Sequence, residues 1–511
     1  MPTTPTTPAP SIAPSTAPTT TANLAERLAG LAAREGWWDR PAFHVGDRVW
    51  THGEVHDGAA RAAGTLAELG VGAGERVVVA AADGIEFVWT FLGTARLGAV
   101  AVLTNPRLTA DDHRFVAGDA TPVVAVCEPE LTERFSSAAV VPTTDLAGRV
   151  AQAAPAPAAA VCPDDAAYVQ YTSGTTGRSK GALHRHADGE VYAAAFARGV
   201  LDAQTDDVLF SASKMYFAYG LGNSLFFTLF TGASAVLLAD HPTPDRVASA
   251  AARYDPTVLF AVPTLYANLV GHGAASSFSD VRLAVSAGEA LVPALAERAS
   301  AFLGCPVLDG LGSTEVGQTF CSNTAAALRP GTVGRPLPPY QVEVRGDDGG
   351  VVPARQEGHL FARGPTILLG YLNQPEAFAE VVVDGWLRTG DRARLDDDGF
   401  VHLAGRVDDI ENVGGIKVAP LEVERLLMEH PDVAEVGVAA VLDERGASEL
   451  HAFVVPRPGA DTGPALTDAL LALARDRLAP FKVPRVVTPV AALPRTPTGK
   501  LRRFLLRRGW W

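Results

Sequence analysis

The sequence predicts an α/β protein with a large N-terminal body of several subdomains built on parallel sheets, and a small α+β domain at the C-terminus. The chain has 511 residues, of which 47% are hydrophobic, and this length exceeds what one hydrophobic core serves. From residue 23 to about residue 310, helical stretches alternate with short apolar strands, as in βαβ units. After residue 391 the pattern changes to short strands joined by Asp/Gly turns.

The N-terminal segment, residues 1–22, is rich in Pro, Thr and Ala and lacks both a positively charged start and an apolar stretch. It is therefore predicted to be a disordered tail and not a signal peptide. The next expected elements are helices at 24–35 and 54–69 and strands at 76–81, 99–103, 123–127 and 166–171. Further strands are expected at 233–238, 257–261, 281–286 and 306–308.

A domain boundary is expected near Asp408, after short strands at 393–395 and 400–403. Beyond it, strands are expected at 433–441 and 450–455 and helices at 420–429 and 465–478. This content suits a small α+β domain. The predicted division is a tail at 1–22, a body at 23–407 and a C-terminal domain at 408–511.

Composition narrows the class of protein. The formal net charge of −14 argues against binding to nucleic acid or to an anionic membrane, both of which favour a basic surface. The cysteines are Cys127, Cys162, Cys305 and Cys321. Their wide spacing favours reduced, mostly buried thiols in a cytoplasmic protein. The uncharged segment 215–239 is expected to be buried core, because glycines and Asn223 divide it into pieces too short to span a membrane.

Residues 171–181 carry the strongest functional signal. Their glycines allow a tight turn with exposed backbone N–H groups, their hydroxyls add donors, and Lys180 adds a positive charge. A P-loop is disfavoured, because Gly181 follows Lys180 where a P-loop requires Ser or Thr. A flexible linker is disfavoured, because an apolar strand leads into the segment. The segment is predicted to bind a nucleoside triphosphate.

This segment resembles the signature loop of the adenylate-forming superfamily, which comprises acyl-CoA synthetases, adenylation domains and luciferases. Ser179 stands where that family usually has proline. The resemblance implies a large body and a mobile C-terminal lid joined at one hinge. The ATP-binding residues that it implies in this loop are Thr172, Ser173, Gly174, Thr175, Thr176, Gly177 and Lys180.

A second segment, residues 309–315, resembles the family's adenine-stacking segment. The resemblance implies ATP contacts from Asp309 and Gly310, a contact of Thr314 with the α-phosphate, and a contact of Glu315 with magnesium. A carboxylate suits Mg²⁺, which prefers oxygen ligands and bridges phosphates. An ordinary tight turn would explain these glycines equally well on their own. Together with residues 171–181, the segment predicts a nucleotide site.

Three charged residues complete the implied nucleotide site. Asp391 matches the carboxylate that accepts bonds from the ribose hydroxyls, and Arg406 matches the guanidinium beside it. In isolation, a turn carboxylate and a surface salt bridge would explain these two. Lys500, in residues 494–500, matches the catalytic lysine, whose ammonium stabilises charge as a carboxylate meets a phosphate. The nearby arginines are expected to form a solvated basic tail: Arg502, Arg503, Arg507 and Arg508.

Residues 214–223 and 286–290 resemble benzoate-type aryl-CoA ligases more than fatty-acyl or amino-acid members of the family, and the resemblance spans almost all of residues 23–511. An aromatic ring requires a flat slot with aromatic and small walls. The residues expected to line it are Phe217, Ala218, Tyr219 and Gly288. Tyr216 is expected to belong to the core.

The chain departs from benzoate-type relatives at Gly317 and Gln318, where those proteins commonly carry a bulky aliphatic residue and a histidine. Gly317 is predicted to enlarge the slot, and Gln318 to offer neutral donor and acceptor groups. A substituted or bicyclic aryl acid, such as a hydroxylated benzoate or a naphthoate, is predicted in preference to benzoate. His184 and His186 are expected to be structural, because neither a paired carboxylate nor a metal-ligand spacing accompanies them.

The resemblance implies two half-reactions. An aryl carboxylate attacks the α-phosphate of MgATP to give an aryl-adenylate and pyrophosphate, and the thiol of coenzyme A then displaces AMP. The lid is implied to rotate about Asp408, which moves Lys500 away. The residues that it brings over the pocket are implied to be Gly414, Gly415 and Lys417.

Two other acceptors remain open for the adenylate: a carrier-protein thiol, and nitrite activation for the diazotisation of an arylamine. A non-catalytic nucleotide sensor is disfavoured, because the charged residues of the implied site are all present. The expected partners are an aryl acid and CoA, without nucleic acid or membrane. A homodimer and a carrier protein remain open as partners.

Overall fold

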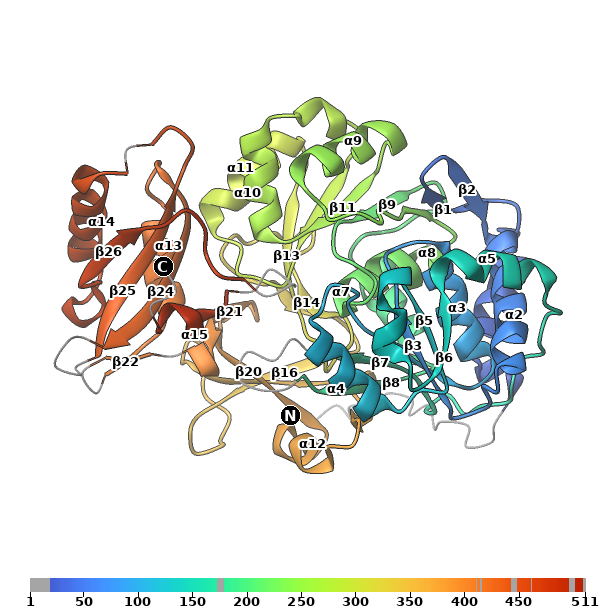
Figure 1. Cartoon of the computed structure of the whole chain (residues 1–511). Coiled ribbons are helices and arrows are strands. Elements are labelled where there is room, and N and C mark those ends of the chain that lie inside the picture. Colours follow the sequence, from blue (N-terminus) through green and yellow to red (C-terminus); the bar gives the residue numbers. More distant parts are fainter. Residues whose placement is uncertain are drawn as a thin grey trace, which may run out of the picture.

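The computed structural model describes residues 19–171, 179–409, 411–413, 416–442, 448–460, 462–495 and 501–508. In these residues, two sheets with mainly parallel strands and one antiparallel sheet form the body, and the C-terminal domain lies to one side of them (Figure 1). The predicted α/β class, with a large body and a small second domain, is confirmed.

The first sheet contains the strands that flank the phosphate-loop segment. Its strands are β3 (Arg76–Ala80), β4 (Val100–Leu103), β5 (Val124–Cys127), β6 (Ala139–Pro142), β7 (Ala166–Tyr171), β8 (Gly181–Arg185) and β18 (Gly370–Tyr371). The order is β18-β8-β7-β4-β3-β5-β6, and the run from β7 to β6 is parallel. Alternate residues of β3 lie in two separate apolar clusters. Helices α2 (His52–Glu68) and α3 (Ile85–Arg96) therefore cover one face, and α4 (Ala110–Ala120) covers the other.

The second sheet supplies most of the loops of the candidate site. Its strands are β1 (Pro41–Val45), β2 (Arg48–Thr51), β9 (Val208–Ser211), β10 (Ser234–Val236), β11 (Val258–Ala261), β12 (Leu283–Ser286), β13 (Val307–Gly312), β14 (Thr319–Ser322) and β15 (Arg335–Pro336). The order is β15-β14-β13-β12-β11-β9-β10-β1-β2, with parallel pairing from β13 to β1.

Three helices pack on one face of this sheet in a cluster of their own, and Figure 1 shows them together at the top of the body. They are α9 (Pro244–Tyr254), α10 (Pro263–His272) and α11 (Pro293–Leu303). Each begins with proline, whose missing N–H needs no partner in a first helical turn and whose fixed φ suits the helix.

The antiparallel sheet leads the chain toward the C-terminal domain. Its strands are β16 (Gln341–Arg345), β17 (Gly358–Arg363), β19 (Val382–Val383), β20 (Trp386–Leu395) and β21 (Val401–Arg406). Helix α12 (Pro375–Val381) precedes β19, and the short turn η6 (Val407–Asp409) follows β21. The predicted boundary at Asp408 therefore falls in a turn between the last strand of this sheet and the next hairpin.

The C-terminal domain packs a sheet between helices. Its strands are β24 (Val433–Leu442), β25 (Ser448–Pro456) and β26 (Val486–Pro489), and a hairpin of β22 (Glu411–Val413) and β23 (Ile416–Val418) precedes them. Helices α13 (Pro420–Leu427) and α14 (Pro464–Arg477) share one apolar cluster with the sheet, and α15 (Arg503–Leu506) packs in another. The expected α+β content is present.

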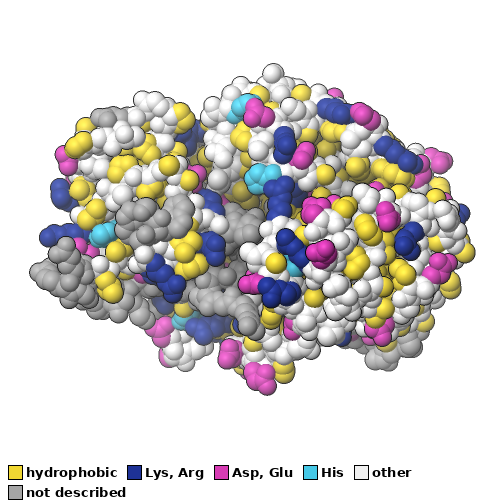
Figure 2. Space-filling view, viewed as in Figure 1, with side chains coloured by type: hydrophobic (Ala, Val, Ile, Leu, Met, Phe, Trp, Pro, Cys, Tyr) yellow, Lys and Arg dark blue, Asp and Glu magenta, His cyan; other side chains and the backbone are white. Residues whose placement is uncertain are grey.

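The segment 215–239 is buried and divided, as predicted. It forms α7 (Ala218–Gly220), the π-helical turn η4 (Leu221–Phe226), α8 (Phe227–Thr231) and β10. None of the helices in the described ranges is long and apolar enough to cross a membrane. Cys127, Cys305 and Cys321 are buried, as expected for structural thiols. On the face drawn in Figure 2, acidic and basic side chains are interspersed and form no large basic area.

Two sequence predictions differ from the structure. The predicted tail extends too far, because Thr19 pairs with Val161 and residues 20–22 form a short 3-10 turn ahead of α1 (Leu24–Arg34). The predicted basic tail is wrong for two arginines. Arg503 is 8% exposed and donates to Glu424 at 2.5 Å, and Arg507 lies 2.9 Å from Glu411. Burial of α15 against β24 brings these guanidinium groups to carboxylates of the same domain.

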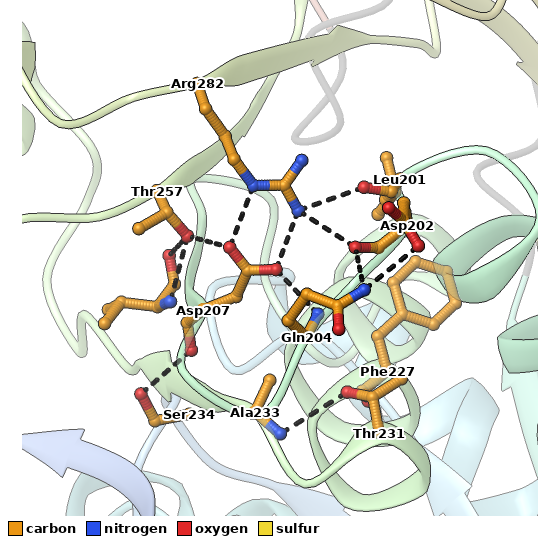
Figure 3. Close-up of polar contacts among 11 residues, drawn as sticks. Leu201, Asp202, Gln204, Asp207, Phe227, Thr231, Ala233, Ser234, Thr257 and Arg282 are labelled. Carbon is orange, nitrogen blue, oxygen red and sulfur yellow. Dashed lines mark hydrogen bonds and ion pairs between the residues drawn. The ribbon is translucent and has the colours of Figure 1, made fainter.

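A buried ionic network joins the beginnings of three parallel strands in the second sheet (Figure 3). Arg282 donates to both carboxylate oxygens of Asp207, at 3.0 and 2.7 Å. Thr257 and the backbone N–H of Gln204 also donate to this carboxylate, at 2.6 and 2.8 Å. Burial alone would raise the pKa of Asp207, but these hydrogen bonds outweigh it and the pKa is lowered.

The Asp207→Asn variant is expected to lose about 2 kcal/mol of stability at neutral pH, because it removes the charged acceptor of Arg282. The lowered pKa means that the contribution is complete above the unfolded-state pKa of about 4 and is lost as pH falls through the folded-state pKa. Urea unfolding of both proteins across acidic pH should show the two stabilities converging.

The exposed neighbour Asp206 supplies the matched control, Asp206→Asn. It is expected to leave stability unchanged at every pH. A stability gap for Asp207→Asn that persists unchanged in acid would contradict the ionic origin of the effect.

Candidate active site

The candidate site lies where parallel strands of the second sheet end. Strands β9, β11, β12 and β13 are neighbours and run in the same direction. Their carboxyl ends lead into residues 212–217, Val262, residues 287–289 and the turn after Gly312. Loops at the carboxyl ends of parallel strands are where ligands bind in such sheets. The predicted aryl-binding and adenine-binding segments are therefore brought to one edge.

Thr314 and Glu315 lie in a tight turn between β13 and β14. The Ser313 hydroxyl accepts from the backbone N–H of Val316 at 3.2 Å, and the Ser313 carbonyl accepts from the N–H of Gly317 at 2.9 Å. Gly317 has a φ of +86°, which favours glycine. The two predicted catalytic residues are half-buried in this turn, whereas the residues that follow are buried.

Tyr371 connects the turn to the phosphate-loop segment, a role that the sequence analysis missed. Its hydroxyl donates to Glu315 Oε1 at 2.9 Å, and Lys180 Nζ lies 5.1 Å from the centre of its ring. Burial, followed by the Glu315 carboxylate, raises the pKa of Tyr371 above its usual value. The phenol therefore stays protonated and donates. No sequence motif marks this tyrosine, because it reaches the site only through the pairing of β18 with β8.

The phosphate-loop segment is anchored at both ends. Strand β7 enters it at Tyr171, and Gly181 pairs with Tyr171 on the return strand β8. A Cβ at Gly181 would lie 2.8 Å from a methyl of Val169, so the strand approaches too closely for a side chain. The predicted residues Thr172 to Gly177 lie outside the described residues.

The predicted ribose pair lies together. Asp391 and Arg406 are direct partners in the antiparallel pairing of β20 with β21. Their side chains meet at 3.5 Å, and Arg406 also donates to the Thr389 carbonyl at 3.1 Å. Gly390, directly before Asp391, has a φ of +80°. The two residues thus form one polar patch on strands and not on separate turns.

The predicted aryl slot has an aromatic wall at the end of β12. Tyr219 is half-buried, its hydroxyl donates to the Val285 carbonyl at 3.2 Å, and its ring meets Phe260 edge-on at 6.2 Å. Phe217 and Ala218 are half-buried beside it, and Gly288 is exposed with a φ of +91°. Tyr216 is 8% exposed and belongs to the core, as predicted.

The structure gives other roles to Gly317 and Gln318 than those predicted. A Cβ at Gly317 would lie 1.8 Å from the hydroxyl of Tyr192, so Tyr192 fills the space and the slot is not enlarged there. Gln318 is 2% exposed, and its amide donates to the Tyr219 carbonyl at 3.3 Å. Its oxygen accepts from the N–H and hydroxyl of Thr319, at 2.8 and 3.0 Å. The polar groups of Gln318 are thus bonded to protein atoms.

Asp309 and Gly310 lie on strand β13, just before the turn of Thr314 and Glu315. The Asp309 side chain is buried, its Oδ1 has no hydrogen-bond partner among the described residues, and burial raises its pKa well above the usual value. The positive charge of Arg425, on α13 of the C-terminal domain, opposes this rise. The backbone carbonyl of Asp309 is bonded to Asn323 at 3.0 and 3.2 Å.

A magnesium ion is implied by the family resemblance. The described ranges contain no group of three or more His, Cys, Asp and Glu side chains that could hold a metal. Glu315 nevertheless offers a half-buried carboxylate, and its Oε1 accepts a hydrogen bond from Tyr371. One carboxylate supplemented by phosphate oxygens is the usual arrangement for Mg²⁺ on a nucleotide. The donor set therefore fits a nucleotide-bound Mg²⁺ and not an all-protein metal cage.

Arg495, directly before the segment that contains Lys500, makes one of the contacts between the C-terminal domain and the body. Arg495 pairs with Glu289 of the body at 3.1 Å and with Glu435 of its own domain at 2.6 Å. Lys500, Gly414 and Gly415 lie outside the described residues, as do the side chains of Asp408 and Lys417. The backbone of Lys417 pairs with residue 412 in the β22–β23 hairpin.

His186 is structural, as predicted. Its Nδ1 accepts from the N–H of Leu24 at 3.2 Å, and burial lowers its pKa to about 4. Arg185 donates to the Ile367 carbonyl at 2.7 Å. His184 differs from the prediction, because a carboxylate does accompany it: Asp188 lies 3.2 Å from its Nδ1.

The chain matches known protein families and characterised relatives. The model of the AMP-binding enzyme family matches residues 31–372, and that of the AMP-binding enzyme C-terminal domain matches residues 422–500. The p-hydroxybenzoic acid–AMP ligase FadD22 of Mycobacterium tuberculosis (strain CDC 1551 / Oshkosh) is 44% identical over 95% of this chain and 69% of its own length. Benzoate–CoA ligase of Thauera aromatica is 39% identical over 86% of each chain.

A solved structure of a related protein has the same fold. The benzoate CoA ligase of Burkholderia xenovorans LB400 has a TM-score of 0.89 and 35% identity, covering 95% of this chain and 99% of that chain. The family matches account for both the body and the C-terminal domain. The chain therefore belongs to the AMP-binding enzyme family, the adenylate-forming superfamily, and is similar to its benzoate-type aryl-CoA ligases.

Proposed function

We propose that this enzyme activates an aromatic carboxylic acid as an aryl-adenylate at the expense of MgATP, and then transfers the aryl group to coenzyme A. One observation carries the proposal: the Gln318 amide donates to the Tyr219 carbonyl at 3.3 Å. This bond ties the turn that contains Thr314 and Glu315 directly to the aromatic wall of the slot. A ring lying against Tyr219 would present its carboxylate to the α-phosphate beside Thr314.

The first half-reaction needs two anions to meet. The carboxylate oxygen attacks the α-phosphorus, the bond to the bridging oxygen breaks, and pyrophosphate leaves. The chain would stabilise this charge with Lys180, Thr314 and Lys500, while Asp391 and Arg406 hold the ribose. A bound Mg²⁺ on Glu315 would neutralise charge on the phosphates.

We propose a substituted benzoate as the acid, and a hydroxylated benzoate ahead of a naphthoate. The relatives support this choice, since their names include p-hydroxybenzoic acid, benzoate and 3-hydroxybenzoate. The geometry gives no extra room at Gly317, because Tyr192 fills the space beside it. Gly317 therefore gives no reason to prefer a bicyclic acid.

The second half-reaction needs a different arrangement of the same domains. In the proposed cycle the C-terminal domain rotates at Asp408 in η6, so that the β22–β23 hairpin replaces the Lys500 segment at the pocket. The CoA thiolate then attacks the aryl carbonyl and AMP leaves. Segments 23–407 and 408–511 act as the fixed and moving parts.

A carrier-protein thiol is the second candidate acceptor. One observation favours it: the FadD22 relatives are named as AMP ligases and not as CoA ligases. Both acceptors use the same adenylation site, so the acceptor is decided by the second half-reaction.

A panel of aryl acids tests substrate and acceptor together. Pyrophosphate release with MgATP is expected to be fastest with a monohydroxybenzoate and at least about tenfold lower in kcat/KM with naphthoates, a difference of about 1.4 kcal/mol. With CoA present, mass spectrometry should detect the aryl-CoA. Equal efficiency on all rings would contradict the substrate, and adenylate turnover that ignores CoA would favour the carrier thiol.

Replacing Lys500 by Ala is expected to lower the adenylation rate by about 100- to 1,000-fold, because the charge that bridges the two anions is lost. Thioester formation from chemically synthesised aryl-AMP and CoA should stay within a few-fold of wild type. Lys482→Ala is the matched control, since this lysine of the same domain pairs with Glu422 at 2.6 Å. Equal loss of both half-reactions in Lys500→Ala would contradict the assignment.

The hinge proposal predicts a split of the two steps. Asp408→Pro is expected to spare adenylation and to suppress thioester formation, because proline fixes φ at the position where the backbone must rotate. Asp408→Ala, which keeps that freedom, should retain both steps. Single-turnover measurements of each half-reaction make the comparison, and parallel loss of both steps would rule out a hinge at this residue.

A further inference from the structure

A buried polar cluster lies directly beneath the turn of Thr314 and Glu315. It consists of His184 on β8 together with Asp188 and Tyr192 at the two ends of helix α6 (Asp188–Tyr192). The His184 side chain is 0% exposed and the Asp188 side chain 2% exposed. Tyr192 is 1% exposed. Such burial of an ionisable pair requires that each polar atom be satisfied by a neighbour.

His184 is bonded to the turn itself. Its Nε2 lies 2.8 Å from the carbonyl oxygen of Thr314. A carbonyl can only accept a hydrogen bond, so Nε2 carries the proton and donates. The bond reaches the backbone of the residue whose side chain is assigned to the α-phosphate.

The other ring nitrogen, Nδ1, is contacted by two side chains of helix α6. Asp188 Oδ2 lies 3.2 Å from His184 Nδ1 and also accepts the N–H of Arg185 at 3.0 Å. The Tyr192 hydroxyl lies 3.3 Å from the same Nδ1. The ring of Tyr168 stacks on the imidazole at 5.0 Å. With both nitrogens and one face engaged, the orientation of the imidazole is set, as in sites where a carboxylate orients a histidine.

The turn packs tightly against this cluster. A Cβ at Gly317 would lie 1.8 Å from the Tyr192 hydroxyl and 3.0 Å from His184 Cε1. On the outer side, Leu368 donates to the Glu315 carbonyl and Thr366 to the Val316 carbonyl, each at 2.8 Å. Three consecutive carbonyls, those of residues 314 to 316, are therefore held, and His184 holds that of Thr314.

We propose that His184, oriented by Asp188 and Tyr192, is a positioning residue that sets where the Thr314 hydroxyl and the Glu315 carboxylate stand during adenylation. The inference rests on the proposed function. The alternative is a core histidine that contributes only to stability. The two differ in outcome, because a shift of about 1 Å in a catalytic group costs about 100-fold in rate without unfolding the protein.

Two near-isosteric variants separate the roles of the ring nitrogens. His184→Gln places an amide N–H close to the position of Nε2 and can still donate to the Thr314 carbonyl. His184→Asn reaches only the position of Nδ1, beside Asp188, and leaves that carbonyl without its donor. His186→Asn is the control, since His186 is another buried histidine next to β8 that is bonded to Leu24 and not to the turn.

Pyrophosphate release with MgATP and a hydroxybenzoate is the first readout. His184→Asn is expected to lower kcat by about 100-fold with the KM for the aryl acid unchanged, and His184→Gln to recover to within about tenfold of wild type. His186→Asn should lower the melting temperature and leave kcat per folded molecule unchanged. Equal loss in the Gln and Asn variants, or loss that follows only the folded fraction, would overturn the proposal.

Hydrogen exchange gives a second readout that does not require turnover. The backbone amides of residues 313–318 are expected to exchange at least about tenfold faster in His184→Asn than in wild type, and His184→Gln should restore their protection. Unchanged exchange in the Asn variant would overturn the positioning role even if the enzyme is active. If the wild type shows no turnover but the variants differ from it in exchange as expected, the proposed function alone would be overturned.

Discussion

Four neighbouring strands of the second sheet, β9, β11, β12 and β13, run in the same direction, and this shared direction determines where chemistry can occur. Each strand ends at the same edge, so segments separated by about a hundred residues in sequence become neighbours there. The aromatic wall follows β9 in the sequence, and the turn of Thr314 and Glu315 follows β13. The bond between Gln318 and Tyr219 then closes the gap between them. Without parallel pairing, neither segment alone would form a site.

The turn of Thr314 and Glu315 has no regular secondary structure, and its shape depends on contacts from three other parts of the chain. Residues 366–368 hold it from outside, the cluster of His184 and Tyr192 supports it from below, and Tyr371 bonds the Glu315 carboxylate. Such a turn is defined by its neighbours and not by its own propensity. Glycine at position 317 is the local requirement that lets those neighbours approach.

Much of the fold was readable from sequence, since the predicted strands 76–81, 257–261 and 433–441 agree with β3, β11 and β24 to within a residue or two. Asp391 and Arg406 were chosen by motif, and their direct pairing on β20 and β21 places them together. Tyr371 and the Asp188–His184 contact could not be found in this way, because both depend on tertiary packing that carries no local pattern. The role of Gly317 was misjudged because Tyr192, which occupies the space, lies far away in sequence.

The contact between Arg495 and Glu289 affects what separation of the two domains requires. Burial raises the pKa of Glu289, and Arg495, with help from the Thr264 hydroxyl, opposes that rise. An arrangement that separates the two domains would break this ion pair, in which the two side chains meet at 3.1 Å. Each charge would then need water in place of its partner. Separation of the domains therefore requires rehydration of a carboxylate and a guanidinium at the same time.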